Sequence, residues 1–222
     1  TAICDAEGRT LAQGLTTPLH LGSFFDAMLA LTARFRGNVY PEDLFIFNDP
    51  YVASGQHLPD IYIVKPIFLE GELKGWATTV AHHNDVGGIV PGSNAIGARD
   101  IYGEGLRLPA LKLKERGVDV QPIWEILELN VRVPVKVLGD IRAQIAACTV
   151  AAICGTPSAT ASEATKLWAR PRTCERPRWR TVNSNDEWVG SAFQVPLGRT
   201  RAIVGVAVAL TVTPSDSCSD KQ

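Results

Sequence analysis

The sequence predicts an α+β fold: a strand-rich mixed domain with β-hairpins and a few helices, followed by a poorly structured C-terminal tail. Short runs rich in β-branched and aromatic residues, separated by glycine-containing turns, are typical of antiparallel strands. Three other stretches carry apolar residues at helical spacing. Clear periodicity then fades, so we expect a domain over residues 1–148 and an atypical tail over residues 149–222.

The N-terminal part predicts a small hairpin and one helix. Residues 2–13 contain two short strand-like runs around a glycine turn. Ser23 and Asp26 resemble a capping box, so the next helix is expected to begin there and to stop before Gly37. His20 lies just ahead of that expected start, and we interpret it as a structural residue.

The remaining expected elements lie between residues 44 and 148. They are strands at 44–47, 60–68, 74–81 and 106–113, and helices at 123–129 and 135–148, the last interrupted at Gly139. The tail that follows has no histidine and no sustained amphipathic period. We interpret it as sequence without a selected fold, such as a shifted reading frame, and expect it to be disordered; a basic tail for a partner is the alternative.

Composition sets bounds on the class of protein. The chain has 222 residues, a net charge of −1, 45% hydrophobic and 20% charged residues, as in ordinary globular proteins of one or two domains. Near-neutral charge gives no support for nucleic-acid binding, and no apolar run reaches the ~20 residues of a membrane span. Five cysteines without a CxxC pair argue against a disulfide framework and favour the cytoplasm. Because the chain begins with Thr1, we expect a fragment of a longer protein.

The most informative feature is a grouping of histidines and acids. Three of the four histidines lie in the segments 55–60 (GQHLPD) and 81–88 (AHHNDVGG), and each segment also holds an aspartate. Imidazole nitrogens and carboxylate oxygens are typical ligands of a divalent metal used in hydrolytic or Lewis-acid chemistry. The sequence therefore predicts a metal site formed by these two segments.

The expected hairpin explains how the segments meet. With a three-residue loop centred on Gly71, Asp60 lies directly opposite His82, and opposed residues share a face with Cα atoms ~4.5–5.5 Å apart. A two-residue loop, Gly71-Glu72, would instead place His83 opposite Asp60. Pro59 stiffens the bend that carries His57, which favours a fixed distance from His57 to Asp60.

Three further acids are candidates for supporting roles. Asp85 follows the histidine pair and is a candidate base, or a group that orients a metal ligand. Glu104 is a candidate acid or base, although a solvated loop carboxylate is the plainer interpretation. Asp49 follows a buried strand, and we interpret it as an Asx-turn residue, with metal ligation or orientation of a ligand histidine as alternatives.

Several short motifs, in this order, resemble the hydantoinase B family, whose relatives include part of 5-oxoprolinase and the alpha subunit of acetone carboxylase. The resemblance covers roughly residues 1–147 and is carried by Asn48-Asp49-Pro50-Tyr51, Gly55-x-His57-Leu58-Pro59-Asp60, Ala81-His82-His83-x-Asp85-Val86-Gly87-Gly88, Pro91-Gly92-Ser93, Glu104-Gly105-Leu106-Arg107-x-Pro109, Asn130-x-Arg132-x-Pro134 and Gly139-Asp140-x-x-Ala143-Gln144.

The resemblance implies a catalytic subunit that works with a hydantoinase A-like partner, which binds ATP. It also implies a divalent metal, manganese or zinc, with His57, Asp60 and His82 as ligands. No P-loop ending is present in this chain, which agrees with that division of labour.

Three functions are open at this point. The first is ATP-dependent hydrolysis of a cyclic amide, with ring opening of a hydantoin-like or 5-oxoproline-like substrate assisted by the metal. The second is ketone carboxylation on the same scaffold, as in acetone carboxylase. The third is a metal-binding fragment without activity.

Overall fold

The predicted α+β class is confirmed. The structure is a computed structural model that describes residues 1–14, 18–51 and 57–154. Within these residues the elements are β1 (Ala2–Asp5), β2 (Thr10–Gln13), α1 (Pro18–Arg34), β3 (Leu44–Phe47), β4 (Asp60–Leu69), β5 (Glu72–His82), the 3-10 helix η1 (Ile101–Gly103), β6 (Leu111–Glu115), β7 (Val118–Asp119), α2 (Gln121–Asn130) and α3 (Pro134–Cys154).

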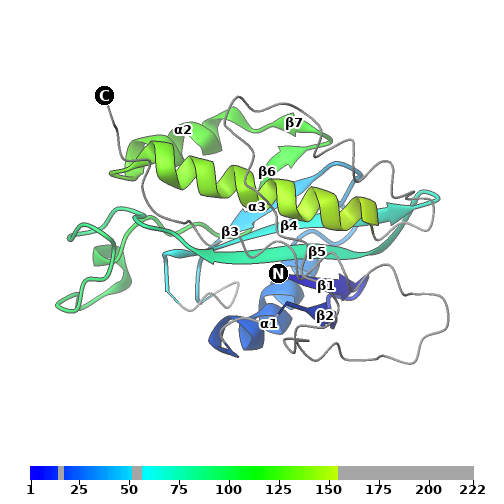
Figure 1. Cartoon of the computed structure of the whole chain (residues 1–222), viewed down its shortest axis with the longest axis horizontal. Helices are drawn as coiled ribbons and strands as arrows, with labels where there is room; N and C mark the ends of the chain where they lie inside the picture. Colours follow the sequence, from blue (N-terminus) through cyan, green and yellow to red (C-terminus); the bar gives the residue numbers. More distant parts are fainter. Residues whose placement is uncertain (15–17, 52–56, 155–222) are drawn as a thin grey trace, which may run out of the picture.

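The strands form one antiparallel sheet with helices on both faces (Figure 1). Its order is β2-β1-β5-β4-β3-β6-β7, so the long β4–β5 hairpin lies at the centre. One apolar cluster joins α1 to one face through Phe24, Met28 and Leu31, while α2 and α3 cover the other face through a second cluster. Two cores therefore share one sheet.

Strand β4 is buried on both faces, and its alternation divides it between the two cores. Ile61 and Ile63 pack into the cluster beneath α2 and α3, whereas Tyr62 and Val64 pack into the cluster beneath α1. Because side chains alternate along a strand, Asp60 belongs to the face covered by α1. This assignment determines which groups Asp60 can meet.

Asp60 pairs with His82, one of the two pairings that the sequence left open, although the loop differs from both expectations. The loop has two residues, Glu70 and Gly71, with φ angles of 54° and 82°, as a type I′ turn requires. Such a loop alone would place Asp60 opposite Ala81. A bulge between Ile67 and Phe68 shifts the register by one residue and restores the Asp60–His82 pair.

The predicted start of the first helix was wrong. α1 begins at Pro18, a residue that suits a first helical turn, and Ser23 lies inside the helix. The Ser23 side chain does not form a cap, because its Oγ contacts the Tyr62 hydroxyl and donates to the His20 carbonyl oxygen at 2.8 Å. His20 is consequently a helical residue.

Two other expected boundaries were also wrong. α3 continues through Gly139 to Cys154, because Val137, Leu138 and Ile141 bury apolar surface on both sides of it and outweigh the ~1 kcal/mol helix cost of a glycine. Strand β6 begins at Leu111 rather than at residue 106.

The segment before β6 is held by the Asn48 side chain and by backbone hydrogen bonds from Asn48 and Asp49 to the Leu108 carbonyl oxygen, without forming a strand. Asn48 donates to the Leu106 carbonyl oxygen at 2.9 Å and accepts from the Leu108 amide at 2.7 Å. Of the expected tail, residues 149–154 belong to α3, and the expectation for residues 155–222 lies outside the described residues. No helix in the described part of the chain has both the length and the apolar character needed to cross a membrane.

Gly75 allows β1 to pair with β5, and Gly75→Ala is expected to destabilise the fold by about 1–3 kcal/mol. A Cβ at this position would overlap the Cys4 carbonyl oxygen of β1. Urea unfolding measures the loss. Gly139→Ala is the matched control: a Cβ there has no neighbour within 4 Å, so this helical substitution should stabilise by about 0.5–1 kcal/mol. Equal midpoints for Gly75→Ala and the wild type would contradict the prediction.

Candidate metal centre

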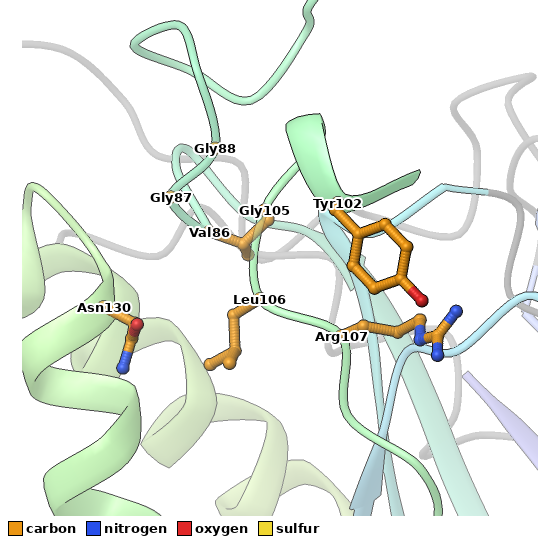
Figure 2. A pocket seen from close by; sticks show the side chains of 8 residues that line it. All are labelled: Val86, Gly87, Gly88, Tyr102, Gly105, Leu106, Arg107 and Asn130. Atoms are coloured by element: carbon orange, nitrogen blue, oxygen red, sulfur yellow. The ribbon is translucent and has the colours of Figure 1, made fainter. Parts of the chain in front are cut away.

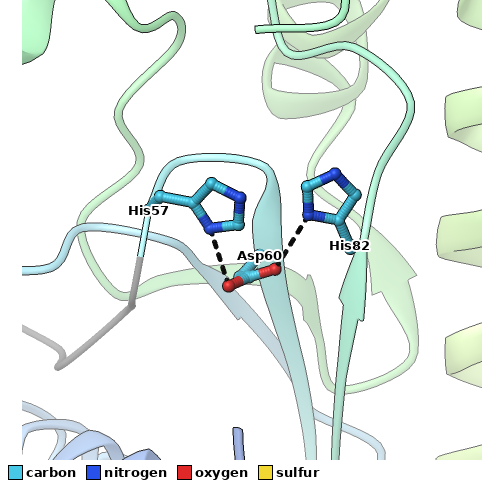
Figure 3. A group of neighbouring side chains, drawn as sticks. All are labelled: His57, Asp60 and His82. Atoms are coloured by element: carbon cyan, nitrogen blue, oxygen red, sulfur yellow. Dashed lines mark hydrogen bonds and ion pairs between the residues drawn. The ribbon is translucent and has the colours of Figure 1, made fainter. Parts of the chain in front are cut away.

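Asp60, the first residue of β4, is fully buried, and its carboxylate faces several imidazoles. His57 Nδ1 lies 2.8 Å from Oδ2, and His82 Nδ1 lies 3.3 Å from Oδ1 (Figure 3). The ligand atoms of these three residues all lie within 4.8 Å of one another. The structure thus brings together the three side chains that the family resemblance implied as metal ligands.

Local backbone contacts hold the bend that carries His57. The Asp60 amide donates to the His57 carbonyl oxygen at 3.0 Å. The Pro59 carbonyl oxygen accepts from the His83 amide at 2.8 Å, which ties the bend to the end of β5. The β4–β5 hairpin carries Asp60 and His82, and the bend that carries His57 directly precedes β4. The positions of all three candidate ligands therefore depend on this hairpin and its bend.

The two imidazoles form the open side of this group. Their rings stack with centroids 4.8 Å apart and an interplanar angle of 28°. The side chains of His57 and His82 are 34% and 45% exposed, whereas that of Asp60 is 0% exposed. A cation held here would have a buried anion behind it and would face solvent between the two rings.

One oxygen of Asp60 indicates that a cation fits. Within the described residues, Oδ1 is buried and accepts no hydrogen bond, because His82 Nδ1 is close enough for an ion pair but is not aligned for donation. A buried carboxylate oxygen without a partner is costly, by several kcal/mol. A divalent cation would satisfy it, and two imidazoles with one carboxylate suit zinc and other first-row metals.

The choice between His82 and His83 follows from strand alternation. His82 lies beside Asp60 on the α1 face, whereas His83 is buried on the other face, where its Nε2 lies 2.9 Å from Gln144 Oε1 of α3. Burial lowers the pKa of His83, and the Gln144 hydrogen bond only partly opposes this. His83 is therefore part of the packing under α3.

His20 also contacts Asp60, which the sequence interpretation did not predict. Its Nε2 lies 3.2 Å from Asp60 Oδ2, and its side chain is 18% exposed. The expectation of a structural role rested on the wrong helix start. Had the helix been extended to Pro18, His20 and Ser23 would have fallen on one face, a spacing that makes both face the sheet.

Asp85 anchors the loop that follows β5. Its Oδ1 accepts from the amides of Gly87 and Arg132, and its Oδ2 accepts from the Gly92 amide and the Arg132 guanidinium, at 2.9–3.0 Å. Burial acts to raise the pKa of Asp85, but these hydrogen bonds outweigh it and hold the pKa at about 2. A carboxylate bound in this way is suited to orient groups rather than to accept a proton.

A cavity of about 450 Å³ is lined in part by Gly105, the residue after Glu104, but not by Glu104 itself. The lining residues are Val86, Gly87, Gly88, Tyr102, Gly105, Leu106, Arg107 and Asn130 (Figure 2). Glu104 itself is half-buried at the end of η1, where its amide donates to the Ile101 carbonyl oxygen at 3.1 Å. Its role as an acid or base stays a prediction.

Asp49 forms the turn that was expected. Its Oδ1 accepts from the Tyr51 amide at 3.0 Å, which is the Asx-turn bond. Its Oδ2 lies 3.6 Å from Arg107 Nε, so the side chain also links the turn to the segment before β6.

Comparison with known proteins places these features in a family. Residues 1–153 match the family described as Hydantoinase B/oxoprolinase. The chain is 36% identical over 149 residues to the beta subunit of the caprolactamase of Pseudomonas jessenii, covering 67% of this chain and 26% of that protein. It is 33% identical over 161 residues to the 5-oxoprolinase of Saccharomyces cerevisiae, covering 67% and 12%.

Two solved structures of related proteins are also similar to this chain. The crystal structure of the ATP-dependent caprolactamase from Pseudomonas jessenii matches with a TM-score of 0.64 at 36% identity, over 67% of this chain and 26% of that chain. Nucleotide-free acetone carboxylase matches with a TM-score of 0.62 at 28% identity, over 67% and 20%. The match spans only 26% and 12% of the length of the two curated relatives named here. Since the matched region covers more than half of the chain, this protein belongs to the hydantoinase B/oxoprolinase family.

Proposed function

We propose that this chain carries the metal centre of a metal-dependent subunit of an ATP-dependent cyclic-amide hydrolase, which opens a hydantoin-like or oxoproline-like ring. The observation that carries the proposal is the buried carboxylate of Asp60. Its Oδ1 has no hydrogen-bond donor among the described residues, and the partly exposed imidazoles of His57 and His82 lie 2.8 and 3.3 Å from its two oxygens. The relatives support it, since they include the beta subunit of a caprolactamase and a 5-oxoprolinase.

The residues would divide the work as follows. A divalent metal held by His57, Asp60 and His82 would supply Lewis-acid polarisation of the ring carbonyl and a reactive water. Asp60 brings the negative charge and is buried, whereas the two imidazoles are partly exposed. The two exposed imidazole edges leave the front of the site accessible to a small ring.

Asp85 and Glu104 are assigned supporting roles in this proposal. Asp85 would act through Arg132, because the pair holds the loop from Gly87 to Gly92 that follows His82. Glu104, which is half-buried and directly precedes the cavity-lining residue Gly105, would be the group that moves a proton during ring opening. Asp85 in that scheme is an orienting group and not the base.

ATP would be used on a partner subunit of the hydantoinase A type, which would phosphorylate the amide oxygen before ring opening. The chain has no Gly-Lys-Ser/Thr loop of its own, and one solved relative is described as an ATP-dependent caprolactamase. Ketone carboxylation is the second candidate, favoured by the likeness to acetone carboxylase. ATP-dependent turnover of hydantoin, or of acetone with bicarbonate, by the chain with its partner would separate the two.

Metal analysis tests the proposed centre directly. The purified wild-type chain, loaded with Mn²⁺ or Zn²⁺ and desalted, is expected to retain one metal per chain by elemental analysis. His57→Ala and His82→Ala are each expected to retain less than about a tenth of that, because two remaining donors no longer enclose the cation. Glu72→Ala is the matched control, since Glu72 is exposed at the opposite end of β5. Equal metal content in all four proteins would refute the assignment.

A further inference from the structure

His20 contacts the proposed metal centre from an element that supplies none of the three ligands. It comes from α1, 40 residues before Asp60, and its Nε2 is 3.2 Å from Asp60 Oδ2. His57 Nδ1 lies 2.8 Å from the same oxygen. Oδ2 is thus approached by two imidazole nitrogens, while Oδ1 is the oxygen left without a hydrogen bond among the described residues.

His20 is not one of the candidate metal ligands. The described side chains whose ligand atoms all lie within 4.8 Å of one another are His57, Asp60 and His82. The short contact of His20 with this group is to Oδ2, and not to the oxygen that lacks a partner. Like His82 Nδ1 at Oδ1, His20 Nε2 lies at ion-pair distance from Oδ2 without being aligned as a hydrogen-bond donor. At 3.2 Å it is close enough to donate once the ring turns, and an imidazole that donates to a ligating carboxylate holds its orientation.

The docking of α1 keeps His20 in this position. Ser23, three residues further along the helix, contacts the hydroxyl of Tyr62, which is two residues after Asp60 on the same face of β4. Helix α1 therefore makes two polar contacts with the same face of β4, one at Asp60 and one at Tyr62. Phe24 adds an edge-on ring contact to Tyr62, with centroids 6.0 Å apart. Figure 1 shows α1 lying across the face of the sheet opposite to α3.

We propose that His20 is a positioning residue for the metal centre: its Nε2–H donates to Asp60 Oδ2 and keeps Oδ1 directed at the cation. This inference rests on the proposed metal site of His57, Asp60 and His82. Outer hydrogen bonds of this kind typically contribute 10–100-fold to metal affinity. His20 belongs to a different element from the ligands, so α1 becomes part of the metal centre.

Two substitutions separate a hydrogen bond from simple packing. His20→Gln retains an N–H donor near the position of Nε2, whereas His20→Leu fills a similar volume without a donor. Titration of the full chain with Mn²⁺, followed by the signal of free Mn²⁺, gives the dissociation constant for each. His20→Leu is expected to weaken binding 10–100-fold at an unchanged stoichiometry, and His20→Gln to remain within about threefold of the wild type.

Leu31→Val is the control for helix docking, because Leu31 packs α1 onto the sheet further from the site. It should lower the midpoint of urea unfolding and leave the Mn²⁺ dissociation constant within twofold. Wild-type affinity in His20→Leu would overturn the inference, as would an equal loss in His20→Gln or in Leu31→Val. Failure of the wild-type chain to bind Mn²⁺ and Zn²⁺ would instead overturn the proposed metal centre itself.

Discussion

Asp60→Asn is expected to weaken binding of Mn²⁺ or Zn²⁺ by more than 100-fold, which corresponds to about 2.7 kcal/mol. The substitution keeps the volume of the side chain but removes the only buried negative charge among the three proposed ligands. It also turns an NH₂ group toward imidazoles that now face a carboxylate. The remaining two imidazoles bind a divalent cation much more weakly than the complete group.

Thermal unfolding gives a second measurement of the same loss. At a metal concentration 100 times the dissociation constant, binding should stabilise the wild-type chain by about 2.7 kcal/mol and raise Tm by roughly 5–10 °C. Asp60→Asn should show no such rise. Asp49→Asn is the matched control, because Asp49 is a buried aspartate whose contacts are with the Tyr51 amide and Arg107. A metal-dependent rise in Asp60→Asn equal to that of the wild type would rule out Asp60 as a ligand.

Asp85→Ala is expected to destabilise the fold by about 3 kcal/mol or more. The substitution leaves the amides of Gly87, Gly92 and Arg132 without their acceptor, and the Arg132 guanidinium loses its anion. Arg132→Ala should cost less, about 1–2 kcal/mol, because Asp85 would retain three amide donors. Urea unfolding at pH 7 measures both. A loss below 1 kcal/mol for Asp85→Ala would contradict this account of the loop.

The same hydrogen bonds predict how stability depends on pH. The pKa of Asp85 in the folded chain is about 2, below its ordinary value of 3.8. The unfolded chain therefore takes up the proton first as pH falls, so the contribution of Asp85 is complete above about pH 5. It is lost between about pH 4 and pH 2 and amounts to about 2 kcal/mol. The difference in unfolding free energy between the wild type and Asp85→Ala should shrink by this amount over that window.

The hairpin is the part of the site that sequence reasoning could reach. Asp60 and His82 pair through contacts between neighbouring strands, and the alternation of side chains is a local property of the backbone. The loop length was nevertheless misjudged, since a two-residue turn and a bulge at Ile67 together give the register that a three-residue loop was expected to give. A bulge adds one residue to one strand of a pair, so its position depends on how the two strands pair and not on either run alone.

The partner of Asp85 could not be predicted from the neighbouring sequence. Its position after the histidine pair marked it as a polar candidate, but its partner Arg132 lies 47 residues further along the chain. The contact forms because the end of α2 is brought against the loop after β5, where the Arg132 amide also donates to Asp85 at 3.0 Å. Sequence spacing alone carries no information about such a distant pair.

By itself, the sequence determined the α+β class, the central hairpin and the approach of His57 and of one histidine of the pair 82–83 to Asp60, because strand pairing and a proline-stiffened bend act over a few residues. Only the tertiary structure decided that His20 belongs with them. Apolar periodicity tells which side of α1 is buried, but it does not tell which face of the sheet that side covers. His20 meets Asp60 because α1 packs against the face of the sheet that carries Asp60 and not against the face that carries His83.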